Sequence, residues 1–290
     1  MCATLLAFGE ILWDVYPEEK FLGGASLNFA AHFAKFGHKA DMLSALGNDA
    51  LGEEARAKLV EWKLDHRFVP ALGEKETGKC LVTLDENSIP SYNLLNDVAY
   101  DYISCDEVSR SFDVLYFGTL ALRSDYNFAS LKALLARQTF GEIFVDVNIR
   151  PPFYSEKTVR FAVQNATILK ISQEELPTVA ALLGSDESTD HVAFAASLAR
   201  HYPNLKCIII TLGGDGAYAL LCKSGESAFC PAEKVSVKST VGAGDSFGAA
   251  FVSEYLSGKS LAACLKTASA VAGFVVSQTA AVPDYDPKAL

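Results

Sequence analysis

The residues best suited to chemistry lie in the segment Ser239-Thr-Val-Gly-Ala-Gly-Asp-Ser-Phe247. An apolar pattern of helical spacing follows this segment, so the triplet Gly242-Ala243-Gly244 is expected at a helix N-terminus, with Asp245 in the first turn. Glycines let backbone N–H groups approach an anion closely, and the helix dipole adds about half a positive charge. The segment therefore predicts either an anion site beside a carboxylate or a glycine turn that Asp245 merely caps.

A second group of polar residues lies near the start of the chain. Asn28 follows Gly23-Gly24 in the first turn of a predicted helix, where its amide is placed to bind a hydroxylated ligand. His32 and Lys35 fall on the same flank of this helix as Asn28. For these two residues the sequence favours a solvated helix face over a role in binding.

Two carboxylates outside these segments are further candidates. Asp14 follows Trp13 after the first predicted strand, and a carboxylate beside an aromatic ring suits a pair of sugar hydroxyls. Glu175 suits hydrated Mg²⁺, which prefers oxygen ligands. The alternatives are an aspartate in a surface turn and a glutamate that only complements the helix dipole.

The elements that position these residues alternate between apolar runs and segments of helical period. Near-continuous apolar runs, typical of strands covered on both faces, lie at 4–8, 114–117, 143–147, 167–171 and 207–212. The helical segments between them predict a parallel sheet between two helix layers. The carboxyl ends of such strands meet at one edge of the sheet, where a ligand crevice forms.

Polar residues and glycines gather at the ends of these runs. Alternation puts Asp146, Asn148 and Arg150 on one side, provided that the strand continues that far. Lys170 lies near the end of the next run. The segment Thr211-Leu-Gly-Gly-Asp-Gly216 is either a nucleotide-binding turn or an ordinary hairpin turn. A phosphate or sugar site requires such a gathering of polar side chains and glycines at one edge of the sheet.

Residues 68–103 differ from the rest of the chain. A β-leaning run at 79–84, a turn at 85–87 and a second run at 91–95 predict an antiparallel hairpin. The hairpin is either a flap over the ligand crevice or a surface decoration.

The composition limits the class of protein. With 290 residues, 50% of them hydrophobic, the chain is too apolar for disorder and long enough for one large core with a small appendage. A net charge of −10 lacks the basic surface that binds nucleic acid or anionic membranes. The seven scattered cysteines form no Cys-x-x-Cys pair, which predicts neither a disulfide framework nor a zinc site. With no membrane span or signal peptide in the pattern, we expect a cytoplasmic protein.

Five motifs in order along the chain resemble the PfkB (ribokinase-like) carbohydrate kinases. They are Gly23-Gly24-Ala-Ser-Leu-Asn28, Gly47-Asn-Asp49-x-x-Gly52, Asp146-Val-Asn148-Ile-Arg150, Thr211-Leu-Gly213-x-x-Gly216 and Gly242-Ala-Gly-Asp245-Ser-Phe. The segments 8–14 and 146–150 are most similar to the fructokinase branch. The resemblance implies a ribokinase-like three-layer α/β/α sandwich, with a central mostly parallel sheet and a small β lid. It assigns residues 1–11, 23–67 and 104–290 to the core, and 12–22 and 68–103 to the lid.

The resemblance also implies an activity, the transfer of the γ-phosphoryl group of ATP to a hydroxyl of a small sugar. Fructose or a related ketose is the leading substrate. Ribose, an acidic keto-sugar bound through Arg150, a nucleoside, and a non-catalytic sugar- or nucleotide-binding regulator are the alternatives. An exposed edge of the lid sheet implies a possible homodimer.

The site residues that the resemblance implies fall into four groups. Asp245 is the base, and the N–H groups of Gly242, Ala243 and Gly244 form the anion hole. Asp14, Gly24 and Asn28 hold sugar hydroxyls, with Arg150 nearby. Glu175 organises Mg²⁺. The residues of the nucleotide site are Lys170, Thr211, Gly213, Gly216 and Ser269.

Three departures from the family pattern limit what is carried over. Ser239 stands where the family often has an aspartate linked to a monovalent cation, so activation by K⁺ is in doubt. Ser172 replaces the asparagine of an Asn-x-x-Glu motif that ends at Glu175. Near the C-terminus the segment 268–282 keeps a helical pattern, but Ser269 and Ala280 replace the usual Asn and Gly, so the adenine contacts stay open.

Overall fold

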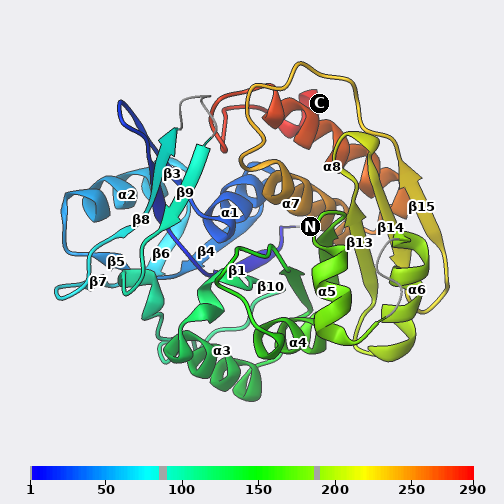
Figure 1. Cartoon of the computed structure of the whole chain (residues 1–290), viewed down its shortest axis with the longest axis horizontal. Helices are drawn as coiled ribbons and strands as arrows, with labels where there is room; N and C mark the ends of the chain where they lie inside the picture. The colour runs from blue at the N-terminus through cyan, green and yellow to red at the C-terminus, as the bar shows by residue number, and fades with distance from the viewer. Residues whose placement is uncertain (1, 85–89, 186–189) are drawn as a thin grey trace.

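A central sheet of nine strands organises the chain in the computed structural model, which describes residues 2–84, 90–185 and 190–290 (Figure 1). Its strands pair in parallel except at one edge, where the last two strands are antiparallel. Their order across the sheet is β15 (Ser227–Cys230), β14 (Ala217–Leu221), β13 (Cys207–Thr211), β12 (Ile168–Ser172), β11 (Glu142–Asp146), β10 (Val114–Gly118), β1 (Thr4–Phe8), β4 (Lys39–Leu43) and β6 (Asp65–Phe68).

Both faces of this sheet are covered because the strand residues are apolar on both sides. Leu5 and Ala7 of β1 enter one core, and Leu6 and Phe8 enter the other. The first core is closed by α1 (Ala25–Lys35), α2 (Ala50–Glu61), α7 (Ala243–Leu256) and α8 (Leu261–Val276). The second is closed by α3 (Asp125–Arg137), α4 (Glu156–Asn165), α5 (Leu176–Leu183) and α6 (His191–His201). The predicted α/β/α sandwich with a mostly parallel sheet is confirmed.

A separate small sheet lies beside the large one. Its order is β3 (Lys20–Gly23), β2 (Leu12–Val15), β8 (Gly78–Leu84) and β9 (Pro90–Leu94). The hairpin predicted from the two β-leaning runs is present as β8 and β9, whereas the predicted turn at 85–87 lies outside the described residues. The division of the chain into core and lid, and a homodimer through the lid, stay predictions.

The motif that runs from Gly47 to Gly52 joins the small sheet to α2. Asp49 caps α2 by accepting from Gly52 N–H at 2.8 Å, and it also accepts from the Thr77 hydroxyl at 2.7 Å, just before β8. A Cβ on Gly52 would lie 2.2 Å from the Gly47 carbonyl oxygen, so only glycine fits there. Two short strands, β5 (Leu46–Gly47) and β7 (Ala71–Leu72), complete this junction.

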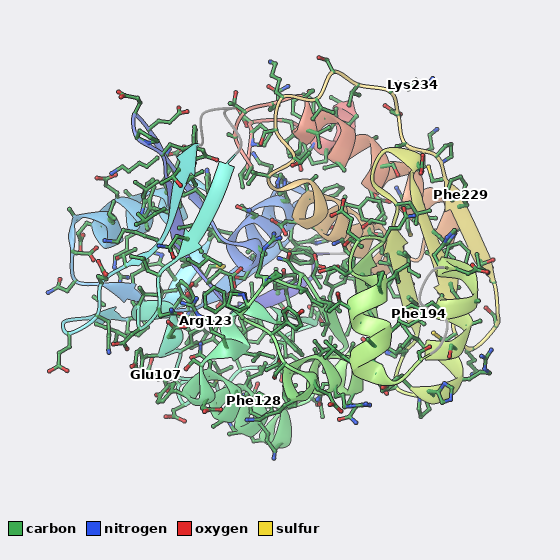
Figure 2. The ribbon with its side chains drawn as sticks, viewed as in Figure 1. Glu107, Arg123, Phe128, Phe194, Phe229 and Lys234 are labelled. Carbon is green, nitrogen blue, oxygen red and sulfur yellow. The ribbon has the colours of Figure 1, made fainter. Side chains whose placement is uncertain are left out.

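A buried ion pair ties the end of the small sheet to the large one. Arg123, which is labelled in Figure 2, donates to Asp101 at 2.8 and 2.9 Å and to the Leu95 carbonyl, just after β9, at 2.6 Å. Asp101 belongs to the 3-10 turn η1 (Ala99–Asp101), and Arg123 ends the turn η2 (Leu120–Arg123). The remaining 3-10 turns are η3 (Gly213–Asp215) and η4 (Pro287–Ala289).

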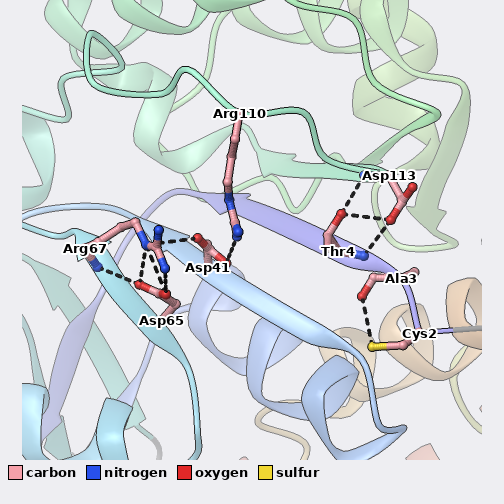
Figure 3. Close-up of polar contacts among 8 residues, drawn as sticks. All are labelled: Cys2, Ala3, Thr4, Asp41, Asp65, Arg67, Arg110 and Asp113. Carbon is pink, nitrogen blue, oxygen red and sulfur yellow. Dashed lines mark hydrogen bonds and ion pairs between the residues drawn. The ribbon is translucent and has the colours of Figure 1, made fainter.

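Charged residues also join neighbouring strands of the large sheet, as Figure 3 shows. Asp41, which is buried in β4, lies between Arg110 and Arg67 and pairs with both guanidinium groups. Asp113 accepts from the backbone and the hydroxyl of Thr4, each at 2.8 Å, and so holds the start of β1. Neither contact lies at the carboxyl edge of the sheet, and we assign both a structural role.

Two expectations about element ends are wrong. β11 stops at Asp146, and Asn148 has a φ of +43°, so Asp146, Asn148 and Arg150 do not share one side of a strand. The helix expected over 268–282 is also shorter than predicted: α8 ends at Val276. None of the described helices has the length and apolar character needed to cross a membrane.

Candidate active site

The register of two parallel strands places opposite charges at the carboxyl edge of the sheet. Asp146 of β11 pairs with Lys170 of β12, and alternation turns both side chains to the same face as Phe144 and Ile168. The Lys170 ammonium lies 2.8 Å from Asp146 Oδ2, and both side chains are buried. This pair forms a buried charged floor under α7.

The N-terminus of α7 lies on this floor. Gly242 is the N-cap, with a left-handed φ of +80°. A Cβ on Gly244 would lie 3.1 Å from Lys170 Nζ, so the absent side chain allows the helix to approach the ammonium. The N–H of Ala243 donates to the Thr240 carbonyl at 3.3 Å, whereas that of Gly244 has no partner among the described residues. Backbone donors, helix dipole and ammonium together attract an anion.

Asp245 lies in the first turn of α7 and is buried. Its Oδ2 accepts from the Asn28 amide at 2.8 Å, which brings α1 and α7 together. Burial raises the pKa of Asp245 to about 7 and the charge of Asp146 adds to the increase, while the Asn28 hydrogen bond and the charges of Lys170 and Arg150 oppose it. A carboxyl group with this pKa accepts a proton near neutral pH, as a general base must.

Glu175 lies close to the same charges at the end of β12. Its carboxylate accepts from Ser172 N–H at 2.8 Å and from Ile149 N–H. Burial and the charge of Asp146 raise its pKa, and Lys170 lowers it. Asp146 Oδ1 is buried and has no hydrogen-bond partner in the described part of the chain.

The donor set at this edge fits Mg²⁺ of the kind that keeps most of its water. Mg²⁺ usually binds one or two carboxylates together with phosphate oxygens and water. Glu175 and Asp146 supply two such carboxylates. No group of three or more His, Cys, Asp or Glu side chains gathers within residues 2–84, 90–185 and 190–290, so the described protein offers no cage made of side chains alone.

The residues predicted to hold a sugar lie on the side of the small sheet. Asp14 of β2 is half-buried, and Gly24 is the N-cap of α1. Burial raises the pKa of Asp14 to about 6, and the charge of Arg150 and a hydrogen bond from Cys80 oppose the rise. Asn28 lies one turn beyond Gly24 and connects this side to Asp245.

Apart from Lys170, the predicted nucleotide residues lie on the other side of α7, with α8 and β13 to β15 (Figure 1). Thr211 pairs with Ser172 at the end of β13, and its carbonyl accepts from the N–H of residue 173. Gly213 is exposed and Gly216 is buried in a turn that joins the antiparallel strands β13 and β14, so this segment is a hairpin turn in form. Ser269 is half-buried on α8, which packs against β14 and β15.

Sequence reasoning missed two buried polar residues near this edge. Glu10 accepts from Ala25 N–H at 2.8 Å, and so caps α1, whose N-cap has no side chain. The Tyr116 hydroxyl is buried without a partner in the described residues, and burial raises its pKa, as do the charges of Asp146 and Asp245. Two features of the sequence could have revealed them. The glycine at the start of α1 has no side chain to cap the helix, and Tyr116 lies two residues before Gly118, on the same face of the strand.

His32 was misread from the sequence. The expected solvated face is wrong for this residue, because its side chain is fully buried. Its Nε2 lies 2.9 Å from the Ala281 carbonyl oxygen and its Nδ1 lies 2.7 Å from the Tyr285 hydroxyl. Lys35 is also largely covered and pairs with Asp284 at 3.6 Å. The C-terminal segment that covers this flank is far away in the sequence, so helical periodicity did not reveal it.

Comparison with known proteins points to one family. The model of the family described as pfkB family carbohydrate kinase matches residues 8–288. The 5-dehydro-2-deoxygluconokinase of Halalkalibacterium halodurans is 30% identical over 275 residues, which cover 89% of this chain and 80% of that protein.

Solved structures share the fold over almost the whole chain. A sugar kinase of Pyrococcus horikoshii, solved in complex with ATP, has a TM-score of 0.81 at 25% identity and covers 99% of this chain and 96% of its own. A fructokinase of Vibrio cholerae, solved with fructose, ADP and calcium ion, has a TM-score of 0.81 at 21% identity. The match covers 97% of this chain and 94% of that chain.

Proposed function

The chain belongs to the pfkB family of carbohydrate kinases, and we propose that it transfers the γ-phosphoryl group of ATP to a hydroxyl of fructose or a related ketose, with Asp245 as the base. It is a sugar kinase, a phosphotransferase with a hydroxyl acceptor. The observation that carries the proposed site is the buried Asp245, with a pKa of about 7, beside the N-terminus of α7.

In the proposed reaction the sugar hydroxyl lies between Asp14 and Asp245. Asp245 accepts the hydroxyl proton as the oxygen forms a bond to the γ-phosphorus, and the bond from this phosphorus to the bridging oxygen of ADP breaks. The N–H groups of Gly242 and Gly244 and the Lys170 ammonium stabilise the negative charge on the transferring group. Ala243 N–H joins them once it leaves its long bond to Thr240.

The remaining site residues have supporting roles in this proposal. Asn28 orients Asp245, and Gly24 and Asn28 line the sugar side. Thr211, Gly213, Gly216 and Ser269 line the nucleotide side. Glu175 and Asp146 would hold Mg²⁺ together with phosphate oxygens and water, and the ion would neutralise part of the phosphate charge. That contribution matters in a protein with a net charge of −10.

The proposed lid consists of residues 12–22 and 68–103. The hydrogen bonds from Thr77 to Asp49 and the ion pair of Arg123 with Asp101 anchor its base. Closure of the lid would exclude water, which competes with the sugar for the phosphoryl group. Asp14 lies on β2 of the small sheet, so closure would also bring this carboxylate to the sugar.

A second acceptor, an acidic keto-sugar, is favoured by a specific observation. Arg150 is exposed, and its charge acts on both Asp14 and Asp245. A guanidinium group at that position suits a substrate carboxylate. The relative from Halalkalibacterium halodurans is named for 5-dehydro-2-deoxygluconate, a sugar acid.

The activity is tested by measuring ADP formation over a panel of fructose, other ketoses, ribose, 5-dehydro-2-deoxygluconate and nucleosides. We expect one ketose or keto-sugar acid to give the highest kcat/KM, and Asp245→Asn to lower kcat by about 10²–10⁴-fold. Asp125→Asn, in the first turn of α3, is the matched control and should keep full activity. ADP formation unchanged by Asp245→Asn would refute the proposed base.

Arg150→Met separates the two acceptors. If the substrate is a sugar acid, this variant raises its KM at least tenfold. If the substrate is fructose, the KM changes less, because the sugar carries no carboxylate for Arg150 to bind.

We also propose that K⁺ is not required for activity. The Ser239 hydroxyl accepts from Val241 N–H at 3.2 Å, and a hydroxyl is a weaker cation ligand than the aspartate of related sequences. Replacing KCl by NaCl at constant ionic strength should leave kcat within twofold. A rise of tenfold or more with KCl would contradict this expectation.

A further inference from the structure

One flank of α1 supports the N-terminus of α7 in two ways. Asn28 donates to Asp245, and His32, one turn further along α1, lies 2.9 Å from the carbonyl oxygen of Ala281. Ala281 in turn packs on Gly242, where a Cβ would lie 2.7 Å from that same carbonyl oxygen. The base and the predicted anion hole are therefore both supported by α1.

The hydrogen bonds of His32 define its tautomer. A backbone carbonyl only accepts hydrogen bonds, so Nε2 carries the proton that is donated to Ala281. Burial lowers the pKa of His32 to about 4, which keeps the ring neutral, so Nδ1 is free to accept from the Tyr285 hydroxyl at 2.7 Å. Tyr285 thus selects the form of His32 that donates to Ala281.

The segment that carries Ala281 packs on the core through Val282 and Tyr285, but the described residues give it few polar ties besides His32. α8 ends at Val276, and residues 277–286 form a turn, bends and irregular chain before η4. Besides His32, Lys35 holds this segment, through an ion pair with Asp284 at 3.6 Å and a position over the Tyr285 ring at 5.2 Å. Asp284 is exposed, so its ion pair adds little. The buried hydrogen bond of His32 is the strongest polar tie.

We propose that His32 is a positioning residue for phosphoryl transfer, which acts by holding Ala281 against Gly242. Gly242 has a left-handed φ of +80° and begins α7, so a shift of Ala281 changes the direction of the first N–H groups of the helix. This inference rests on the proposed function, because it assumes that those N–H groups bind the transferring phosphoryl group. In this proposal His32 acts through Ala281, and Asn28 continues to hold Asp245 without it.

The test compares two substitutions of His32. His32→Gln keeps a donor at the position of Nε2, whereas His32→Leu fills a similar volume and leaves the Ala281 carbonyl without a partner. Removing one anion-hole donor typically lowers kcat by about 10²–10³-fold, and a displaced donor should have a smaller effect. We expect His32→Leu to lower kcat at least tenfold with the sugar KM within twofold, and His32→Gln to keep kcat within threefold of the parent.

A matched control distinguishes positioning from general stability. Leu59→Ala makes a cavity beneath α2 and lowers the Tm, and it should leave kcat at 25 °C unchanged. A His32→Leu variant with a lowered Tm and a parental kcat would overturn the proposal. Equal losses of kcat in His32→Leu and His32→Gln would also overturn it.

A second measurement does not depend on activity. In the ¹⁵N-histidine-labelled protein, the imidazole resonances of His32 should show Nε2 protonated and Nδ1 unprotonated at pH 7, with the assignment made from the signal lost in His32→Gln. An Nδ1-protonated or charged ring would refute the tautomer on which the proposal depends. A parent protein that phosphorylates no sugar would refute the proposed function and the inference with it, whereas an active parent whose His32→Leu variant keeps the parental kcat would refute the inference alone.

Discussion

Asp245→Asn should stabilise the protein while abolishing most of its activity. The folded protein raises the pKa of Asp245 from 3.8 to about 7, chiefly by burial. A carboxyl group with a raised folded-state pKa binds more protons in the folded than in the unfolded state, so stability falls as the pH rises through this window. Asparagine keeps the shape and accepts from Asn28 through its amide oxygen, but it carries no charge to bury.

The size of this effect follows from the two pKa values. At about 1.4 kcal/mol for each pH unit, ionisation of Asp245 costs the folded state about 4 kcal/mol above pH 7. About 3 kcal/mol of this cost develops between pH 5 and pH 8, because Asp245 is mostly protonated at pH 5 in the folded state. The stability of Asp245→Asn relative to the parent should therefore increase by about 3 kcal/mol over this range.

Urea unfolding of both proteins at pH 5 and pH 8 measures this difference. The comparison cancels the titration of other groups, because both proteins contain them. Asp125→Asn, at an exposed position in α3, should show no pH-dependent difference from the parent. If the stability difference between Asp245→Asn and the parent stays within about 1 kcal/mol from pH 5 to pH 8, the raised pKa of Asp245 is refuted.

Three further predictions concern the surroundings of the site. Asp146→Asn removes a negative charge near Asp245, so the acidic limb of kcat/KM against pH should move to lower pH; an unchanged limb would refute this coupling. Arg123→Leu leaves Asp101 buried without its partner and should lower the unfolding free energy by about 3–5 kcal/mol. In urea unfolding, adding Asp101→Leu should restore part of that loss, and a further loss would argue against the ion pair. Gly242→Ala should lower kcat more than tenfold, because a φ of +80° and a nearby carbonyl oppose a side chain; parental kcat would contradict this.

Local patterns predicted the framework because each depends on neighbours close in sequence. Continuous apolar runs identified the parallel strands β1, β10, β11, β12 and β13 but missed β4 and β6, and helical spacing after Gly244 placed Asp245 in the first turn of α7. The ends of elements were less certain. β11 stops at Asp146 because the next residues leave the extended conformation, and apolar spacing carries no signal of that change.

The small sheet was predicted only in part. The β8–β9 hairpin is local and was visible in the sequence. The reason for Gly47 was not, because its close contacts include the backbone of Lys75 and Thr77, just before β8. Side chains that meet across 25 residues or more leave no periodic trace in a single sequence.

The sequence by itself determined which residue types end each strand and begin each helix, because backbone conformation and amphipathic spacing are set by near neighbours. Tertiary structure alone decided the environment of those residues. It paired Asp146 with Lys170 through strand register, raised the pKa of Asp245 by burying it, and covered His32 with the C-terminal segment. Charge, desolvation and hydrogen bonding depend on distances in space, and only the packed fold sets these distances.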